Sequence, residues 1–141
     1  MERIRATFNR LRRARRTALI PFIMGGDPDL TTTTKLLIEL EAAGADLIEV
    51  GIPFSDPLAD GPVIQEASAR ALRRGATPPR VLAAIAAASR RLRIPVVALS
   101  YWNPIVQFGS RANGGPDAFV RAARRSGVSG VIVPDVPVDE S

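Results

Sequence analysis

Short apolar runs alternate with longer stretches of helical periodicity along the chain. Four runs of apolar, largely β-branched residues are typical of buried parallel strands, and they lie at residues 18–24, 47–50, 95–99 and 128–133. Before and between them, apolar positions recur every three or four residues. This spacing predicts amphipathic helices at about residues 2–14, 31–43, 62–74, 78–90 and 118–125.

This alternation predicts a parallel sheet flanked by helices, as either a barrel or a doubly wound sheet. Polar residues, prolines and glycines gather directly after the strands, in loops at residues 25–28, 51–60, 101–104 and 134–137. No G-x-G-x-x-G opens a helix, as a dinucleotide-binding doubly wound sheet would need. A (β/α)8 barrel carries its chemistry at this face. Nothing marks a domain boundary, so we expect residues 1–141 to belong to one domain.

Histidine and cysteine are both absent from the 141 residues. This excludes disulfides, thiolate zinc sites and histidine-ligated metals within this sequence, together with serine or cysteine nucleophiles activated by histidine. Proton chemistry near neutral pH must therefore fall to carboxylates, Lys35, Tyr101 or water.

The net charge of +5 comes from the N-terminal segment, because residues 1–16 hold seven arginines against Glu2 alone. Ile4, Phe8 and Leu11 recur there at helical spacing, which predicts an amphipathic helix with a basic outer face. A solvated face, a contact with nucleic-acid phosphates and a targeting helix are all compatible with this pattern. No apolar run reaches the roughly 18 residues of a membrane span, and we expect a cytoplasmic protein.

Glu49 interrupts the apolar second strand. Side chains alternate along a strand, so Ile48 and Val50 share one face while Leu47 and Glu49 share the other. If the first pair packs against the helices, Glu49 points into a barrel, where desolvation of a carboxylate favours general acid/base work. The alternative is a glutamate at the wet end of the strand with no chemical task.

The loop after this strand is rich in proline and aspartate. Asp56 and Asp60 are common turn residues, and Asp60 could cap the helix that opens at Pro62. The density of prolines, with Pro53 and Pro57 in the same loop, indicates a loop held in one shape, as a site or an interface needs.

Aromatic residues lie close to the same strand ends. Phe22 falls near the end of the first strand, and Tyr101 and Trp102 follow the third. They could line a flat apolar pocket for an aromatic ligand, although core packing is an alternative for Phe22.

Residues 43–65 (AGADLIEVGIPFSDPLADGPVIQ) closely resemble the signature of the tryptophan synthase α subunit, and residues 21–28, 101–104 and 134–137 add to the resemblance. The family is a (β/α)8 barrel that cleaves indole-3-glycerol phosphate to indole and glyceraldehyde 3-phosphate.

The resemblance implies roles for individual residues. Glu49 matches the catalytic glutamate of the family and Asp60 matches its partner aspartate. Phe22, Leu99 and Tyr101 fall where family members line the indole pocket.

The resemblance also implies a partner. Pro53, Asp56, Pro57 and Asp135 fall in segments that meet the β subunit, with which the family forms an α2β2 heterotetramer. The β subunit carries pyridoxal phosphate, and no cofactor is expected in the α chain itself.

Length is the main departure from the family. A full barrel takes about 250 residues, so the 141 residues predict the first half of a barrel, without the later loops that grip the phosphate. We therefore expect that these residues alone self-associate and that they have negligible lyase activity.

Two alternative functions remain: another barrel lyase or isomerase acting on a phosphorylated sugar, and a non-catalytic interaction module. A Schiff-base aldolase would need a lysine at a strand end, whereas Lys35 falls on a predicted helix.

Overall fold

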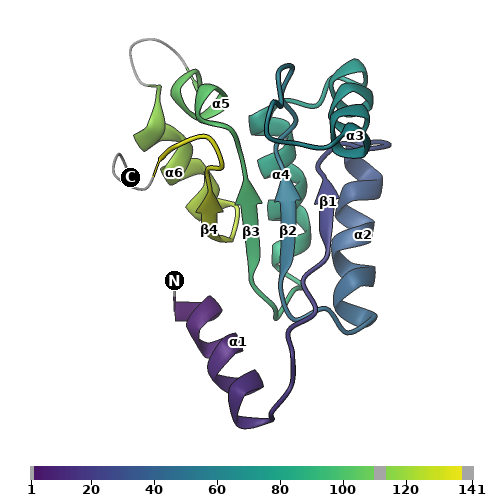
Figure 1. Cartoon of the computed structure of the whole chain (residues 1–141), viewed down its shortest axis with the longest axis vertical. Helices are drawn as coiled ribbons and strands as arrows, with labels where there is room; N and C mark the ends of the chain where they lie inside the picture. The colour runs from purple at the N-terminus through teal and green to yellow at the C-terminus, as the bar shows by residue number, and fades with distance from the viewer. Residues whose placement is uncertain (1, 110–113, 138–141) are drawn as a thin grey trace.

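The computed structural model describes residues 2–109 and 114–137, and it contains the predicted alternation of strands and helices (Figure 1). The elements follow in the order α1 (Glu2–Arg13), β1 (Phe22–Met24), α2 (Leu30–Ala42), β2 (Ile48–Gly51), α3 (Pro62–Arg73), α4 (Pro78–Ser89), β3 (Val96–Leu99), α5 (Trp102–Val106), α6 (Pro116–Arg125) and β4 (Val128–Ile132).

The four strands form one parallel sheet in the order β1-β2-β3-β4. A doubly wound sheet reverses its strand order at a switch point, whereas here each strand pairs with the next strand along the chain. This is the order of strands in a (β/α)8 barrel, which distinguishes between the two architectures that the sequence left open.

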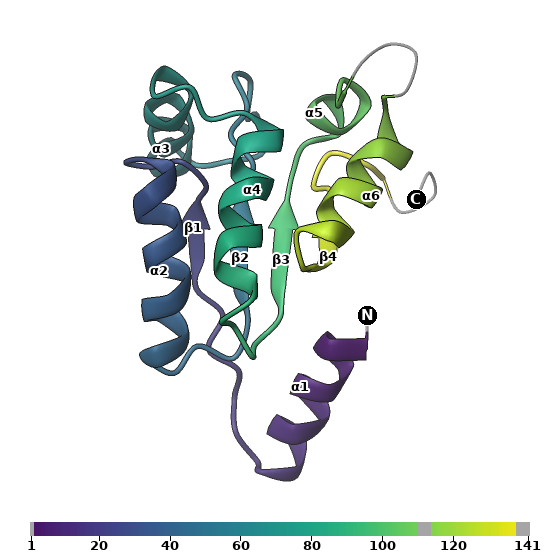
Figure 2. The same ribbon diagram turned by 180° about the vertical axis from the view of Figure 1, so that it is seen from behind.

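Helices α2, α4 and α6 cover one face of the sheet, which Figures 1 and 2 show from opposite sides. Ile48 and Val50 are fully buried on this face in the same apolar cluster as Leu37 of α2 and Val81 and Ile85 of α4. Burial of such side chains contributes on the order of 2 kcal/mol each, so the helix-facing side of the sheet is the hydrophobic core. The inner face is the opposite side of the sheet.

Capping residues explain where α2 begins and ends. The Asp29 carboxylate accepts a hydrogen bond of 2.7 Å from the backbone N–H of Thr32, which satisfies a free donor in the first turn. Gly44 follows the last helical residues with a φ of +101°, a conformation that glycine adopts without strain.

Helix α1 lies at the N-terminal end of the strands, away from the other helices (Figure 1). The buried Asp46 holds the segment that follows α1, because its carboxylate accepts the N–H of Leu19 at 3.2 Å and pairs with Arg10 at 3.1 Å. At the inner face, Ile4 of α1 lies so close to Gly130 of β4 that a Cβ there would be 3.1 Å from its Cδ1. The basic helix is therefore attached to the domain at two points, through Arg10 near its C-terminal end and through Ile4 near its N-terminal end.

The structure differs from the sequence predictions at two points. The first strand was predicted at residues 18–24 but begins only at Phe22, and the residues before it form the connection that rises from α1 to the sheet (Figure 1). The predicted loop at residues 101–104 contains the start of the short helix α5. Among the helices that the structure describes, none combines the length and apolarity required to cross a membrane.

Candidate active site

Glu49 projects from the inner face of the sheet, as strand alternation predicted. Its neighbours Ile48 and Val50 are fully buried against the helices, while the Glu49 side chain is half-buried. Its register partners are Phe22 on β1 and Val97 on β3. Residues paired in register on parallel strands share a face, so the carboxylate lies in a row between an aromatic and an aliphatic side chain.

Gly51 makes room for this row. A Cβ at Gly51 would come within 2.7 Å of Phe22 Cζ and 3.1 Å of Met24 Cε. The side chains of β1 therefore lean over β2 directly beside Glu49, in space that another residue at this position would occupy.

The Glu49 carboxylate takes part in no side-chain hydrogen bond or ion pair with residues 2–109 and 114–137. Structural carboxylates in the same chain behave differently. Asp46 is tied to arginines and to a backbone N–H, and the Asp27 carboxylate accepts two hydrogen bonds from Arg70, at 3.0 and 2.8 Å. The Glu49 carboxylate has no such structural contact in the part of the chain that the structure describes.

The loop between β2 and α3 is fixed near its start by Ser68. The buried Ser68 hydroxyl accepts the N–H of Phe54 at 2.9 Å and donates to its carbonyl at 2.8 Å. This double contact ties the start of the proline-rich loop to α3.

Near its end, the same loop is fixed by Tyr101 and Gln65. The Tyr101 hydroxyl accepts the N–H of Ala59 at 2.9 Å, and the side-chain amide of Gln65 donates to the Asp60 carbonyl at 2.9 Å. The N-cap of α3 is Gly61, without a side-chain cap. The capping role considered for Asp60 is therefore not used.

Tyr101 is buried to 4% exposure, and its ring lies 5.4 Å from the ring of Phe54. Burial raises the pKa of the Tyr101 phenol, the Asp60 carboxylate raises it further, and the hydrogen bond from Ala59 acts in the opposite direction. Tyr101 and Asp60 are thus close neighbours, although 41 residues separate them. Sequence reasoning placed both at the same sheet edge but did not connect them.

The three residues predicted to bind an aromatic substrate come from two strands. Phe22 and Leu99 share the inner face with Glu49, because Leu99 lies two residues beyond the register partner of Glu49 on β3. Tyr101 follows Leu99 by two residues and turns toward the loop that carries Asp60. Phe22, Glu49 and Leu99 thus lie on the inner face of three adjacent strands, and Tyr101 connects the end of β3 to the loop that carries Asp60.

The four residues predicted to meet a partner belong to the loop after β2 and to the segment after β4. Asp56 is exposed and Pro57 half-buried, whereas Pro53 is buried and lines a groove of about 360 Å³ together with Pro78 of α4. The Asp135 carboxylate accepts the N–H of Trp102 at 2.9 and 3.1 Å, at the start of α5. Asp135 thus has a local structural role that the sequence did not suggest.

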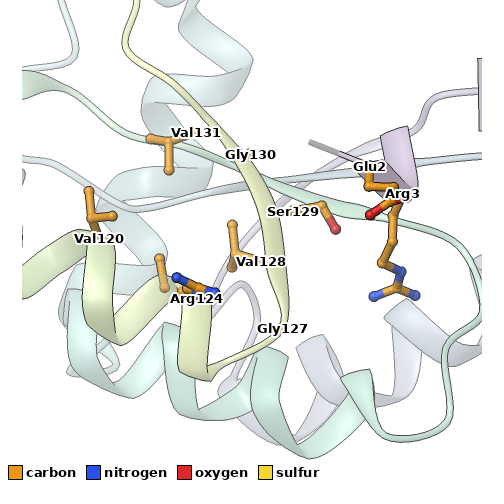
Figure 3. A pocket seen from close by; sticks show the side chains of 10 residues that line it. Glu2, Arg3, Val120, Arg124, Gly127, Val128, Ser129, Gly130 and Val131 are labelled. Carbon is orange, nitrogen blue, oxygen red and sulfur yellow. The ribbon is translucent and has the colours of Figure 1, made fainter. Parts of the chain in front are cut away.

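A second cavity, of about 620 Å³, lies beside β4 and contains none of these predicted residues. Figure 3 shows Val120 of α6 and Val128 and Val131 of β4 around it, with Arg3 of α1 on its far side. It lies along the outer edge of the sheet, where a fifth strand of a barrel would pair with β4.

Comparison with known proteins gives one consistent result. A sequence model of the family described as "Tryptophan synthase alpha chain" matches residues 8–141. The chain is 53% identical over 140 residues to the tryptophan synthase alpha chain of Carboxydothermus hydrogenoformans, covering 99% of this chain and 50% of that relative. It is 47% identical over 138 residues to the corresponding protein of Prochlorococcus marinus strain NATL1A, covering 98% of this chain and 50% of that relative.

Solved structures agree with the sequence matches. The crystal structure of tryptophan synthase subunit alpha from Legionella pneumophila strain Paris superposes with a TM-score of 0.91 at 39% identity, covering 98% of this chain and 51% of that one. The aminoacrylate-bound form of tryptophan synthase from M. tuberculosis gives a TM-score of 0.88 at 38% identity, covering 98% and 54%. The chain spans about half the length of the curated relatives it matches, and its four strands are about half of a (β/α)8 barrel, as predicted.

Proposed function

The chain belongs to the tryptophan synthase alpha chain family, and from this we propose that it supplies the acid/base residues for the lyase step of tryptophan biosynthesis. The reaction is the retro-aldol cleavage of indole-3-glycerol phosphate to indole and glyceraldehyde 3-phosphate. Glu49 is the proposed general acid and base, and Asp60 assists it.

The observation that carries this proposal is the position of Glu49. It is the inward-facing carboxylate of β2, it lies in register with Phe22, and it has no ion-pair partner in the described part of the chain. A carboxylate held on a partly apolar wall without a structural partner is suited to proton transfer.

The cleavage needs two proton transfers. Protonation of the indole ring at C3 makes the ring an electron acceptor. Removal of the proton from the hydroxyl on the adjoining glycerol carbon then lets that oxygen form the aldehyde carbonyl, while the electron pair of the breaking carbon–carbon bond passes to the ring. We assign both transfers to Glu49, which gives the first proton and takes the second. Its protonation state is thereby restored within one turnover.

Asp60 is assigned to the ring nitrogen. Protonation at C3 places positive charge on the indole N–H, and a carboxylate aimed at that position stabilises the charge in the transition state. The loop contacts of Ala59 and Asp60 support this assignment because they fix the backbone at this position.

The inner-face side chains supply the apolar surface for the indole ring. Phe22 and Leu99 flank the row that contains Glu49, and aromatic rings pack favourably against such surfaces. The scheme uses carboxylates and apolar contacts alone, so it calls for no cofactor in this chain.

We further propose a partner, the tryptophan synthase β subunit, in a cytoplasmic α2β2 heterotetramer. The exposed Asp56, together with Pro53, Pro57 and Asp135, forms the proposed contact surface beside the groove at Pro78. The pyridoxal phosphate of the complete enzyme would belong to that partner.

The chain spans about half the length of its relatives, and we propose that the phosphate grip and the rest of the indole pocket come from the other half of the barrel. The test is a chimera that joins residues 1–141 to the part of the Carboxydothermus hydrogenoformans relative that this chain does not cover. We expect the chimera to release indole from indole-3-glycerol phosphate and residues 1–141 alone to release none. A folded chimera that releases no indole would contradict the proposed function.

A further inference from the structure

The hydroxyl of Tyr101 connects the end of β3 to the loop that carries Asp60. We propose that Tyr101 is a positioning residue for Asp60, because the Tyr101 hydroxyl holds the backbone N–H of Ala59, the residue directly before Asp60. The inference rests on the proposed function in that Asp60 acts on the substrate. It gives the Tyr101 hydroxyl a task distinct from lining the indole pocket.

Tyr101 is a rigid point of attachment. Its side chain is 4% exposed and its ring packs against that of Phe54 at 5.4 Å. The buried Ser100 fixes the backbone on which it stands, since its N–H donates to Ile132 of β4 at 3.0 Å and its hydroxyl donates to the Tyr101 carbonyl at 3.0 Å.

The hydroxyl serves two neighbouring residues of the loop. A tyrosine hydroxyl can accept hydrogen bonds and donate one. It accepts the N–H of Ala59 at 2.9 Å, which leaves its own proton to be donated elsewhere. The Asp60 carboxylate, carried by the residue after Ala59, contributes to the raised pKa of the Tyr101 phenol.

Asp60 is held from its other side by α3. Its carbonyl accepts the Gln65 amide at 2.9 Å, and its N–H donates to the Pro57 carbonyl at 3.1 Å. The backbone around Asp60 is thus clamped between a side chain at the end of β3 and a side chain on α3.

The clamp matters because the surrounding loop is otherwise open to solvent. Leu58, two residues before Asp60, is 90% exposed, and exposed loop tips are mobile unless their backbone is held. A displacement of about 1 Å at a reacting group costs on the order of a hundredfold in rate. Without the Tyr101 hydroxyl, the backbone that carries Asp60 would keep the contact with Gln65 but lose the one on the side of β3.

The hydroxyl-to-backbone contact is tested by amide hydrogen exchange of Ala59, followed by NMR in the 141-residue chain. Tyr101→Phe keeps the ring and removes only the hydroxyl, and we expect Ala59 exchange to become roughly tenfold faster, as loss of one hydrogen bond implies. The N–H of Phe54, held by Ser68 at the other end of the loop, should keep its rate. Trp102→Phe is the matched aromatic control and should change neither rate. Unchanged Ala59 exchange in Tyr101→Phe would overturn the proposal.

The contact with Asp60 is tested by a measurement that packing alone would not affect. Tyr101 is the only tyrosine of the chain, so the ultraviolet absorbance of tyrosinate reports this residue alone. We expect Asp60→Asn to lower the pH at which Tyr101 ionises and Asp56→Asn, a carboxylate in the same loop, to leave it unchanged. Equal ionisation in Asp60→Asn and the wild type would overturn the proposal. Neither measurement depends on turnover, so failure of this proposal and failure of the lyase proposal are separate results.

Discussion

Phe22 of β1 and Glu49 of β2 are register partners on the inner face of the sheet. The aromatic side chain and the carboxylate therefore lie side by side on adjacent strands, with Gly51 leaving the space into which Phe22 leans. This relationship joins the apolar surface proposed for the indole ring to the group proposed to protonate it.

The space at Gly51 predicts the effect of adding a single methyl group. Gly51→Ala would place its Cβ 2.7 Å from Phe22 Cζ, and we expect overpacking to cost roughly 1–3 kcal/mol of unfolding free energy. Urea unfolding measures this cost. The double substitution Gly51→Ala with Phe22→Leu should recover part of the loss. Gly61→Ala, where a Cβ would meet no atom within 4 Å, should cost less. Equal costs at the two glycines would show that the inner face is not packed as described.

Asp46 predicts an acid-sensitive contribution to stability. The N–H of Leu19 and then Arg10 and Arg16 lower the pKa of the Asp46 carboxyl from its ordinary value of 3.8, against the opposing effect of burial. A lowered pKa contributes stability that is present above pH 3.8 and lost as the pH falls through the folded-state pKa.

We therefore expect Asp46→Asn to reduce the unfolding free energy at pH 7 by about 1–3 kcal/mol, because a buried hydrogen-bonding carboxylate is replaced. The difference from the wild type should narrow at about pH 3 and below. Urea unfolding at the two pH values measures it, with Glu39→Gln on the exposed side of α2 as the control. A difference independent of pH would show that the charge of Asp46 has no part in fastening the segment after α1.

The sequence predicted the parts of this structure that follow from local pattern. The alternation of Ile48, Glu49 and Val50 gave the inward direction of the carboxylate, and the four apolar runs gave the strands. The polar residues after each strand indicated the edge at which the candidate residues would lie, because the C-terminal ends of parallel strands meet at one edge.

Contacts between distant segments could not be predicted in the same way. The pairing of Tyr101 with Ala59 and of Asp46 with Leu19 depends on tertiary geometry that no periodicity encodes. Helix α5 is five residues long and contains Pro104, so it is too short for helical spacing to be recognised. The first residue of α5 donates its N–H to Asp135, which follows β4. From the local sequence alone, Asp135 is an ordinary loop residue.

The outer edge of β4 predicts self-association of the 141-residue chain. Val131 is 38% exposed and lines the cavity of about 620 Å³, and the adjacent Ile132 is 39% exposed. An open strand edge with apolar side chains favours pairing with other chains. We expect sedimentation to show concentration-dependent association that Val131→Lys reduces. Val63→Lys, at an exposed position of α3 remote from this edge, is the control. A monomer that unfolds cooperatively at all concentrations would contradict this prediction.

The central claim is that Glu49 transfers the protons of the lyase reaction. It is tested most directly by the rate of indole release from indole-3-glycerol phosphate by the chimera, compared among the unmodified protein, Glu49→Gln and Glu66→Gln. The account predicts that Glu49→Gln lowers kcat by about 10²–10⁴, the range for loss of a general acid/base, while Glu66→Gln, an exposed glutamate on α3, keeps the original rate. Indole release by a folded Glu49→Gln chimera at the rate of the unmodified chimera would contradict it.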